Sequence, residues 1–224
     1  MAVDGPAGSG KSSAARGVAR MLGLRYLDTG AMYRALTWWL LAQDIDTASP
    51  DAVIENAGRP VIEVGTDPQA PMICVDGIGV DGPIRSREVS NAVSSVASIP
   101  QVRQRLITMQ REIIARAVAA GRGIVAEGRD IGTVVAPEAA VKVFLTASEE
   151  ARAIRRSADL AADPAATAAT TLRENARRDR RDAPQTARAA DAIEIDATTL
   201  GLDEVIGQIA SLARGARAGA ACPS

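Results

Sequence analysis

The sequence predicts an α/β fold in which a parallel sheet of five strands is flanked by helices. Three observations support it: strand-like runs alternate with helical segments, two of the runs (residues 123–126 and 141–145) are continuously apolar, and a glycine-rich loop lies near the N-terminus. Continuous apolar runs are typical of parallel strands that are covered on both faces. Because βαβ connections are right-handed, we expect ligands at the carboxyl ends of these strands.

The first two βα units occupy residues 1–42. Only three residues precede Asp4, which is short for a strand, so we expect that the chain as given lacks a few N-terminal residues. An amphipathic helix is predicted over residues 13–24 with Gly23 as its stop, followed by a strand over 25–28. A second helix is predicted over 31–42, with Leu36, Trp39 and Leu40 facing inward. The tryptophans are interpreted as packing residues.

Residues 59–87 interrupt this alternation. After a short helix from Asp51, β-rich runs at 60–64, 72–75 and 78–80 are separated by Gly, Pro and Asp. This pattern predicts a small antiparallel sheet, inserted into the main domain.

The remaining elements return to the alternating pattern. Helices are predicted at 87–97, 100–120, 148–160, 164–177 and 202–213, and strands at 123–126, 141–145 and 192–195. We assign residues 1–58, 88–150 and 186–215 to the core, 59–87 to the insertion and 151–185 to a lid region. Residues 216–224 are expected to form a disordered tail.

Composition excludes several classes of protein. The formal net charge is −1, so no global basic field would attract nucleic acid or a membrane surface. There is no histidine, and Cys74 and Cys222 lie far apart without zinc-site spacing. No apolar run reaches the roughly 18 residues of a membrane span. We expect a cytoplasmic monomer with reduced thiols that binds neither nucleic acid nor membrane.

The glycine-rich loop is the strongest motif. Its residues, Gly5-Pro6-Ala7-Gly8-Ser9-Gly10-Lys11-Ser12, fit the phosphate-binding pattern G-x-x-x-x-G-K-S/T at every fixed position. Backbone amides of such a loop cradle phosphate oxygens, the lysine reaches the β- and γ-phosphates, and the Ser12 hydroxyl would ligate Mg²⁺. Lys11 and Lys142 are the only lysines beside twenty-four arginines, so the chain keeps a compact ammonium at this loop. The plainer alternative is a glycine-rich turn that caps a helix.

Polar residues follow three predicted strands: Asp4-Gly5, Asp28-Thr29 and Glu127-Gly128-Arg129-Asp130. Because the carboxyl ends of parallel strands share one edge of a sheet, we expect these clusters to converge. Arg34 and Arg129 are candidates for gripping the phosphate of an acceptor, since a guanidinium matches phosphate oxygens in pairs. The alternative for each is a solvated or structural charge.

A cluster of arginines marks the predicted lid. Its members are Arg152, Arg155, Arg156, Arg173, Arg177, Arg178, Arg180 and Arg181. A nucleic-acid arm is disfavoured because few aromatic residues interleave and acidic residues intervene. We interpret the cluster as a lid that closes over a triphosphate and excludes water, with about half of the arginines on a solvated helix face.

Five stretches, in this order, resemble the motifs of bacterial cytidylate kinases. They are residues 4–12, Leu27-Asp28-Thr29-Gly30-Ala31-Met32-Tyr33-Arg34, Ile84-Arg85 with 89–94, Pro100-Gln101-Val102-Arg103, and residues 127–135. The resemblance implies a P-loop kinase core with a nucleotide-monophosphate-binding β insertion and a short helical lid. It implies transfer of a phosphoryl group from ATP, with Mg²⁺, to CMP or dCMP.

The resemblance also implies roles for particular residues. Residues Gly5–Ser13 and Arg155 would bind ATP, and Lys11, Arg129 and Arg178 would be catalytic. The cytosine edge would be read by Ser94, Arg103 and Asp130, and the CMP phosphate would be held by Arg34 and Arg129. The acceptor pocket would be lined by Asp28, Thr29 and Tyr33, and the sugar would be contacted by Arg178 and Asp182.

One segment departs from the family pattern. After Asp182 the family continues with a hydroxyl residue, one further residue and an arginine, whereas this chain has Ala183-Pro184-Gln185. Arg181 or Arg188 are possible substitutes. Three alternatives therefore stand beside a CMP kinase: another small-molecule P-loop kinase, a nucleotide-binding switch, and a member of the family with an impaired lid. The switch is disfavoured because Lys142 lies in an apolar strand and not in an N/T-K-x-D element.

Overall fold

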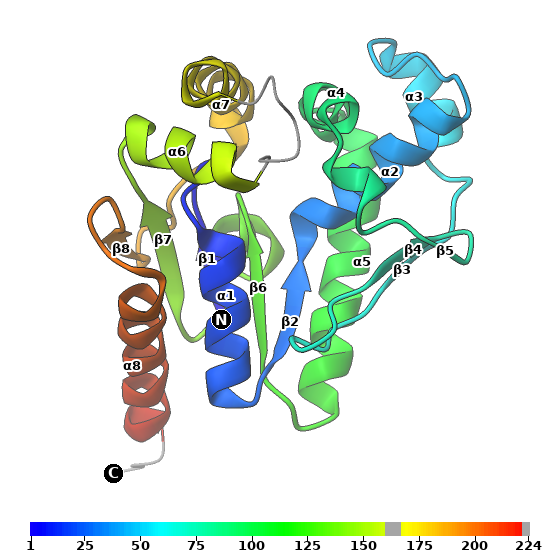
Figure 1. The fold of residues 1–224 in the computed structure, drawn as a ribbon. Helices are drawn as coiled ribbons and strands as arrows, with labels where there is room; N and C mark the ends of the chain where they lie inside the picture. The colour runs from blue at the N-terminus through cyan, green and yellow to red at the C-terminus, as the bar shows by residue number, and fades with distance from the viewer. Residues whose placement is uncertain (160–166, 221–224) are drawn as a thin grey trace. The chain divides into compact units, whose positions relative to one another are not determined.

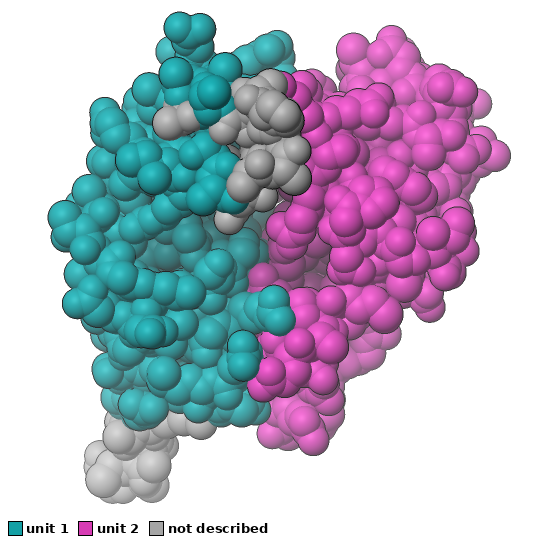
Figure 2. Space-filling model, viewed as in Figure 1, with its two compact units in different colours: residues 1–24, 125–224 teal, residues 25–124 magenta. Residues whose placement is uncertain are grey.

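The computed structural model describes residues 1–159 and 167–220 (Figure 1). The beginning of the helix predicted at 164–177 therefore lies outside the described residues. The chain divides into two compact units, one of residues 1–24 and 125–224 and the other of residues 25–124 (Figure 2). Each unit is described by itself.

The main sheet has five strands in the order β2-β6-β1-β7-β8, which confirms the predicted α/β fold. Its strands are β1 (Ala2–Asp4), β2 (Arg25–Asp28), β6 (Ile124–Gly128), β7 (Lys142–Thr146) and β8 (Ile193–Asp196). Strand β1 pairs in parallel with β6 and β7 and is buried throughout. In this register Asp4 lies opposite Gly128 of β6, so the end of β1 and the end of β6 lie side by side.

Helices surround the strands of the first unit. They are α1 (Lys11–Leu22), α6 (Glu149–Asp159), α7 (Ala168–Asp182) and α8 (Leu202–Ala220), with a π-turn η2 (Ile131–Val135) and a 3₁₀ turn η3 (Ala183–Gln185). Helices α1 and α8 lie side by side (Figure 1). Gly17 permits this approach, because a Cβ there would lie 2.2 Å from Ile206 Cδ1.

Helix α8 runs to Ala220 and so includes residues 216–220 of the segment that was expected to form a disordered tail. Alanine and arginine, which favour a helix, occupy most of these positions.

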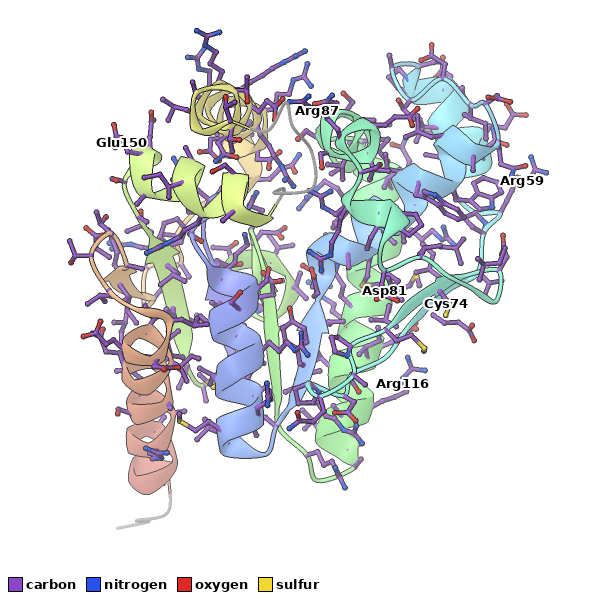
Figure 3. All side chains as sticks on the ribbon, viewed as in Figure 1. Arg59, Cys74, Asp81, Arg87, Arg116 and Glu150 are labelled. Atoms are coloured by element: carbon purple, nitrogen blue, oxygen red, sulfur yellow. The ribbon has the colours of Figure 1, made fainter. Side chains whose placement is uncertain are left out.

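The second unit combines helices with a small sheet. Its helices are α2 (Thr29–Ala42), α3 (Pro50–Asn56), α4 (Arg87–Ala97) and α5 (Pro100–Ala119), with a 3₁₀ turn η1 (Pro83–Arg85). Leu36, Trp39 and Leu40 of α2 are buried as predicted. Trp39 donates its Nε1–H to Asp76 at 2.9 Å and packs under the guanidinium of Arg59, which Figure 3 labels. The interpretation of Trp39 as a packing residue is thus supported.

The antiparallel sheet in this unit has the predicted three strands, β3 (Ile62–Val64), β4 (Ile73–Val75) and β5 (Ile78–Gly79), in that order. Asp76 and Gly77, with φ angles of 50° and 78°, form a two-residue turn between β4 and β5, as an Asp-Gly pair favours. No helix in the described part of the chain is long and apolar enough to cross a membrane.

Candidate active site

The phosphate-binding loop, residues 5–12, connects β1 to α1. Gly5, Gly8 and Gly10 have φ angles of 155°, 74° and 88°, which residues with a side chain rarely adopt. Gly10 is the N-cap of α1, and in the structure no side chain caps the first turn of this helix, which also carries no acidic residue. The positive end of the helix dipole thus lies at the loop, as an anion-binding site requires.

Gly5 lies against β7 without room for a side chain. A Cβ at this position would lie 2.1 Å from the carbonyl oxygen of Leu145. We expect Gly5→Ala to lower the free energy of unfolding by about 2 kcal/mol or more, because backbone atoms of the loop and of β7 must move apart. Urea unfolding measures this change.

A matched control is Gly207→Ala on α8, where a Cβ would meet nothing within 4 Å. This variant should be more stable than the wild type by roughly 0.5–1 kcal/mol, because alanine favours the helix. If Gly5→Ala unfolded at the same urea concentration as the wild type, the close approach of the loop to β7 would be refuted.

Lys11 and two serines begin α1. The Lys11 Nζ donates to the Pro6 carbonyl at 3.3 Å, so the ammonium lies over the loop, and Ser12 and Ser13 are exposed. The hydroxyl of Ser9 is buried inside the loop and finds no hydrogen-bond partner there. The oxygens of a polyphosphate would accept hydrogen bonds from the amides and the Ser9 hydroxyl of this loop. The loop therefore suits the phosphate ligand that the sequence predicts.

Mg²⁺ also fits this chemistry. No cluster of three or more His, Cys, Asp or Glu residues that could hold a metal occurs in the described ranges. Mg²⁺ is commonly held by one or two protein oxygens together with substrate phosphates and water, and not by a cage of protein ligands. The exposed Ser12 hydroxyl at the start of α1 suits that arrangement.

Arg152 and Asp179 connect α6 and α7, the two helices of the predicted lid region (the lid helices), to the loop. Arg152 of α6 is 5% exposed and donates to the carbonyl oxygens of Ala7 and Ala147 and to the Asp179 carboxylate, the last at 2.5 Å. Asp179 of α7 in turn accepts the Ala7 amide at 3.3 Å. Both polar groups of Ala7 are therefore engaged by the lid helices. By contrast, Glu150 in the first turn of α6 is exposed (Figure 3).

Arg155, predicted to contact the donor, lies one turn further along α6. It donates to Ser9 O at 3.4 Å and to the carbonyls of Ala197 and Leu200, which belong to the connection between β8 and α8. Its guanidinium thus joins the phosphate loop to this connection. The structure places Arg155 beside the loop, and its contact with ATP stays a prediction.

Arg129, Arg178 and Asp182 form one charged network. Arg129 donates from Nη1 to Gly5 O at 2.6 Å and from Nε and Nη2 to the Asp182 carboxylate, both at 3.2 Å. Arg178, one turn before Asp182 on α7, approaches the same carboxylate at 3.5 Å. The structure therefore brings together three residues that the sequence predicts for the acceptor phosphate and sugar.

Asp4 accounts for the predicted convergence of two strand ends. Its carboxylate accepts the amides of Ile131 and Gly132, each at 2.8 Å, and is 4% exposed. Burial, reinforced by the negative charge of Asp130, raises the pKa of Asp4, although the two amides and Lys11 oppose this shift. The first and third polar clusters thus meet as predicted.

The second unit holds the other predicted residues. Asp28 accepts the Ala31 amide at 2.9 Å and is the N-cap of α2. Arg34 donates to Ile84 O and Ser90 Oγ, both at 3.0 Å. Ser94 is buried in α4. The predicted acceptor residues that lie in this unit are Asp28, Thr29, Tyr33, Arg34, Ser94 and Arg103.

The remaining lid arginines are mostly on the surface. Arg173, Arg177, Arg180 and Arg181 are exposed, in line with the expected solvated face, and the side chain of Arg156 lies outside the described residues. The atypical segment after Asp182 forms η3, and Arg188 pairs with Glu194 at 2.5 Å. In this structure Arg188 therefore lies in an exposed surface pair.

Two features escaped the sequence interpretation: the contact of Asp179 with Ala7, and the hydrogen bonds that Asp4 makes. Asp4 was recognised only as a strand-end residue. Its position directly before the loop was the available signal. Asp179 lies in a tract of alternating charges, where nothing distinguishes the one acid that reaches the loop.

Known proteins resemble the whole chain. A family model described as cytidylate kinase matches residues 1–215. The cytidylate kinase of Streptomyces coelicolor is 51% identical over 220 residues, covering 98% of this chain and 94% of that protein. Those of Streptomyces griseus and Corynebacterium diphtheriae are 48% and 43% identical, covering 98% and 95% of this chain and 94% and 93% of theirs. The chain belongs to the cytidylate kinase family.

Proposed function

We propose that the protein transfers the γ-phosphoryl group of ATP to CMP or dCMP, giving ADP and CDP or dCDP. The observation that carries the proposal is the family match over residues 1–215. As a member of this family, the chain is a nucleoside monophosphate kinase, a transferase whose phosphate donor is ATP. The phosphate loop, with its three glycines and Lys11, supplies the donor site that this chemistry needs.

On the donor side the loop amides and Lys11 hold the triphosphate. A phosphate oxygen of the acceptor attacks the γ-phosphorus, the bond from this phosphorus to the β,γ-bridging oxygen breaks, and ADP leaves with that oxygen. Charge spreads over the transferring group, so positioning and electrostatics do most of the work. Mg²⁺ held by Ser12 would neutralise donor oxygens when bound.

On the acceptor side we assign Arg34 and Arg129 to the phosphate of CMP, and Ser94, Arg103 and Asp130 to the cytosine edge. A carboxylate, a hydroxyl and a guanidinium complement the amino donor and the ring acceptors of cytosine. The remaining assignments are Asp28, Thr29 and Tyr33 to the pocket and Arg178 and Asp182 to the sugar. We also propose that the enzyme acts as a monomer in the cytoplasm.

A coupled assay of ADP release with Mg-ATP tests the function directly. The acceptors to compare are CMP, dCMP, UMP, AMP, GMP and gluconate. We expect turnover with CMP and dCMP above all others. Selective turnover of another acceptor would identify a different small-molecule kinase, and ATP binding without turnover of any acceptor would favour a lid impaired by Ala183-Pro184-Gln185.

The base-reading residues give a sharper test. In the double variant Ser94→Ala with Asp130→Ala, we expect the preference for CMP over UMP in kcat/KM to fall about 100-fold, because a hydrogen bond to a charged group contributes about 1.5–3 kcal/mol. Ser98→Ala is a matched control, since its hydroxyl is exposed and bonds only the nearby Ser95 carbonyl in the structure. An unchanged preference in the double variant would refute the assignment.

A further inference from the structure

Asp4 is a buried acid for which the proposed chemistry has no use. It is the last residue of β1, and it is almost completely buried beside the phosphate loop. A buried carboxylate is costly unless its oxygens are hydrogen-bonded. Here both oxygens are used: Oδ1 accepts the Ile131 amide and Oδ2 accepts the Gly132 amide, each at 2.8 Å.

These two amides belong to the segment that follows β6. Strand pairing between β1 and β6 ends at Asp4 and Gly128, so the sheet no longer fixes the backbone beyond that residue. The π-turn η2 begins at Ile131, and the side chain of Asp130 at its N-cap does not cap it. The Asp4 carboxylate accepts hydrogen bonds from the first two amides of this turn. It thereby connects β1 to the backbone just beyond the last paired residue of β6.

The held segment directly follows Arg129 and Asp130. Gly5, the neighbour of Asp4, accepts the Arg129 guanidinium at its carbonyl oxygen at 2.6 Å. Two consecutive residues, the last of β1 and the first of the phosphate loop, therefore bind residues 129, 131 and 132, one through its side chain and one through its backbone. The fit at Gly132 is close, because a Cβ there would lie 3.4 Å from Asp4 Oδ2 and 3.2 Å from Lys142 Cδ.

We propose that Asp4 is a positioning residue, which sets Arg129 and Asp130 relative to the phosphate loop and thereby aligns the acceptor with the donor. This inference rests on the proposed function, since it takes Arg129 and Asp130 to contact the acceptor. A carboxylate can accept two amides at once. An asparagine keeps one acceptor and turns an N–H group toward the second amide, so the segment must shift.

The test is Asp4→Asn in the full chain, with steady-state kinetics for both substrates. A misplacement of about 1 Å costs on the order of 100-fold in rate, so we expect kcat/KM for CMP to fall between about 30- and 100-fold. The KM for ATP should stay within about twofold of the wild type, because the loop itself is retained. A purely structural role would not produce this selective loss toward the acceptor.

Two controls separate positioning from general damage. Asp203→Asn removes an exposed acid in the first turn of α8 and should leave both KM values unchanged. Ile209→Ala removes a buried side chain of α8 and should lower the melting temperature without moving the KM for CMP. If Asp4→Asn does not fold, Asp4→Glu keeps both acceptor oxygens but lengthens the side chain by one methylene group, so residues 131 and 132 must shift and the same acceptor-selective loss is expected.

Each outcome has one meaning. If the wild type phosphorylates CMP and Asp4→Asn shows the same kcat/KM for CMP, this inference alone is overturned. Equal losses in kcat/KM toward ATP and CMP in Asp4→Asn would overturn it as well. If the wild type phosphorylated no pyrimidine monophosphate, the proposed function would fail, and the acceptor role of Asp4 would fail with it.

Discussion

Replacing Lys11 by methionine should reduce kcat by about 1,000-fold or more. Its ammonium lies over the phosphate loop, where we assign it to the transferring phosphoryl group. Loss of one preorganised donor at a developing charge costs on the order of 10²–10³ in kcat, and loss of a cation costs up to about 10⁵. Single-turnover kinetics with Mg-ATP and CMP measure the effect on the chemical step.

The chain offers a matched control in its second lysine. Lys142→Met removes the ion pair between Lys142 Nζ and the exposed Asp191 carboxylate, which are 2.7 Å apart. This variant should keep kcat within about twofold of the wild type. Lys11→Arg should also be poorly active, because a planar guanidinium does not replace a compact ammonium. Near-normal chemistry in Lys11→Met would show that the loop does not hold the transferring phosphate.

Arg129→Ala should lower kcat/KM for CMP by about 100- to 1,000-fold. The guanidinium bridges Gly5 of the loop and Asp182 of α7. Its removal takes away the contact that we assign to the phosphate of CMP and leaves the Asp182 carboxylate with less positive charge beside it. Hydrogen bonds to charged groups contribute about 1.5–3 kcal/mol each, which gives this range for one or two lost contacts. Initial rates at varied CMP and saturating ATP measure it.

The surface pair of Arg188 and Glu194 provides the comparison for Arg129. Arg188→Ala removes an arginine that is about half exposed and should change neither kinetics nor stability appreciably, since exposed ion pairs contribute about 0–1 kcal/mol. Equal effects of Arg129→Ala and Arg188→Ala on kcat/KM for CMP would show that Arg129 does not contact the acceptor.

Much of the fold could be predicted because its elements carry local patterns. The apolar runs that became β6 and β7, the glycine stops of the helices and the Asp-Gly turn between β4 and β5 each depend on residues next to one another. The phosphate loop was equally predictable, since its glycines need positive φ angles and its lysine stands at a fixed spacing. Its position between β1 and α1 follows from the same motif.

The contacts that complete the site could not be predicted, because they join residues far apart in the chain. Asp179 meets Ala7 across 172 positions, and Asp4 meets Ile131 across 127. Neither pairing leaves a periodic pattern, and Asp179 is one of several acids among the arginines of α7. The π-turn η2 was not predicted for a related reason, since the acid that accepts its first two amides, Asp4, lies far away in the chain.

The burial of Asp4 has a thermodynamic consequence. Its carboxyl has a pKa above the ordinary value of 3.8, so just above pH 3.8 the native protein retains a proton that the unfolded chain has released. The native state then binds more protons, and the free energy of unfolding falls as the pH rises through this window. Above the raised pKa the full cost of the buried charge is present. Above that pKa the fold thus gives up stability to keep a negative charge at the end of β1.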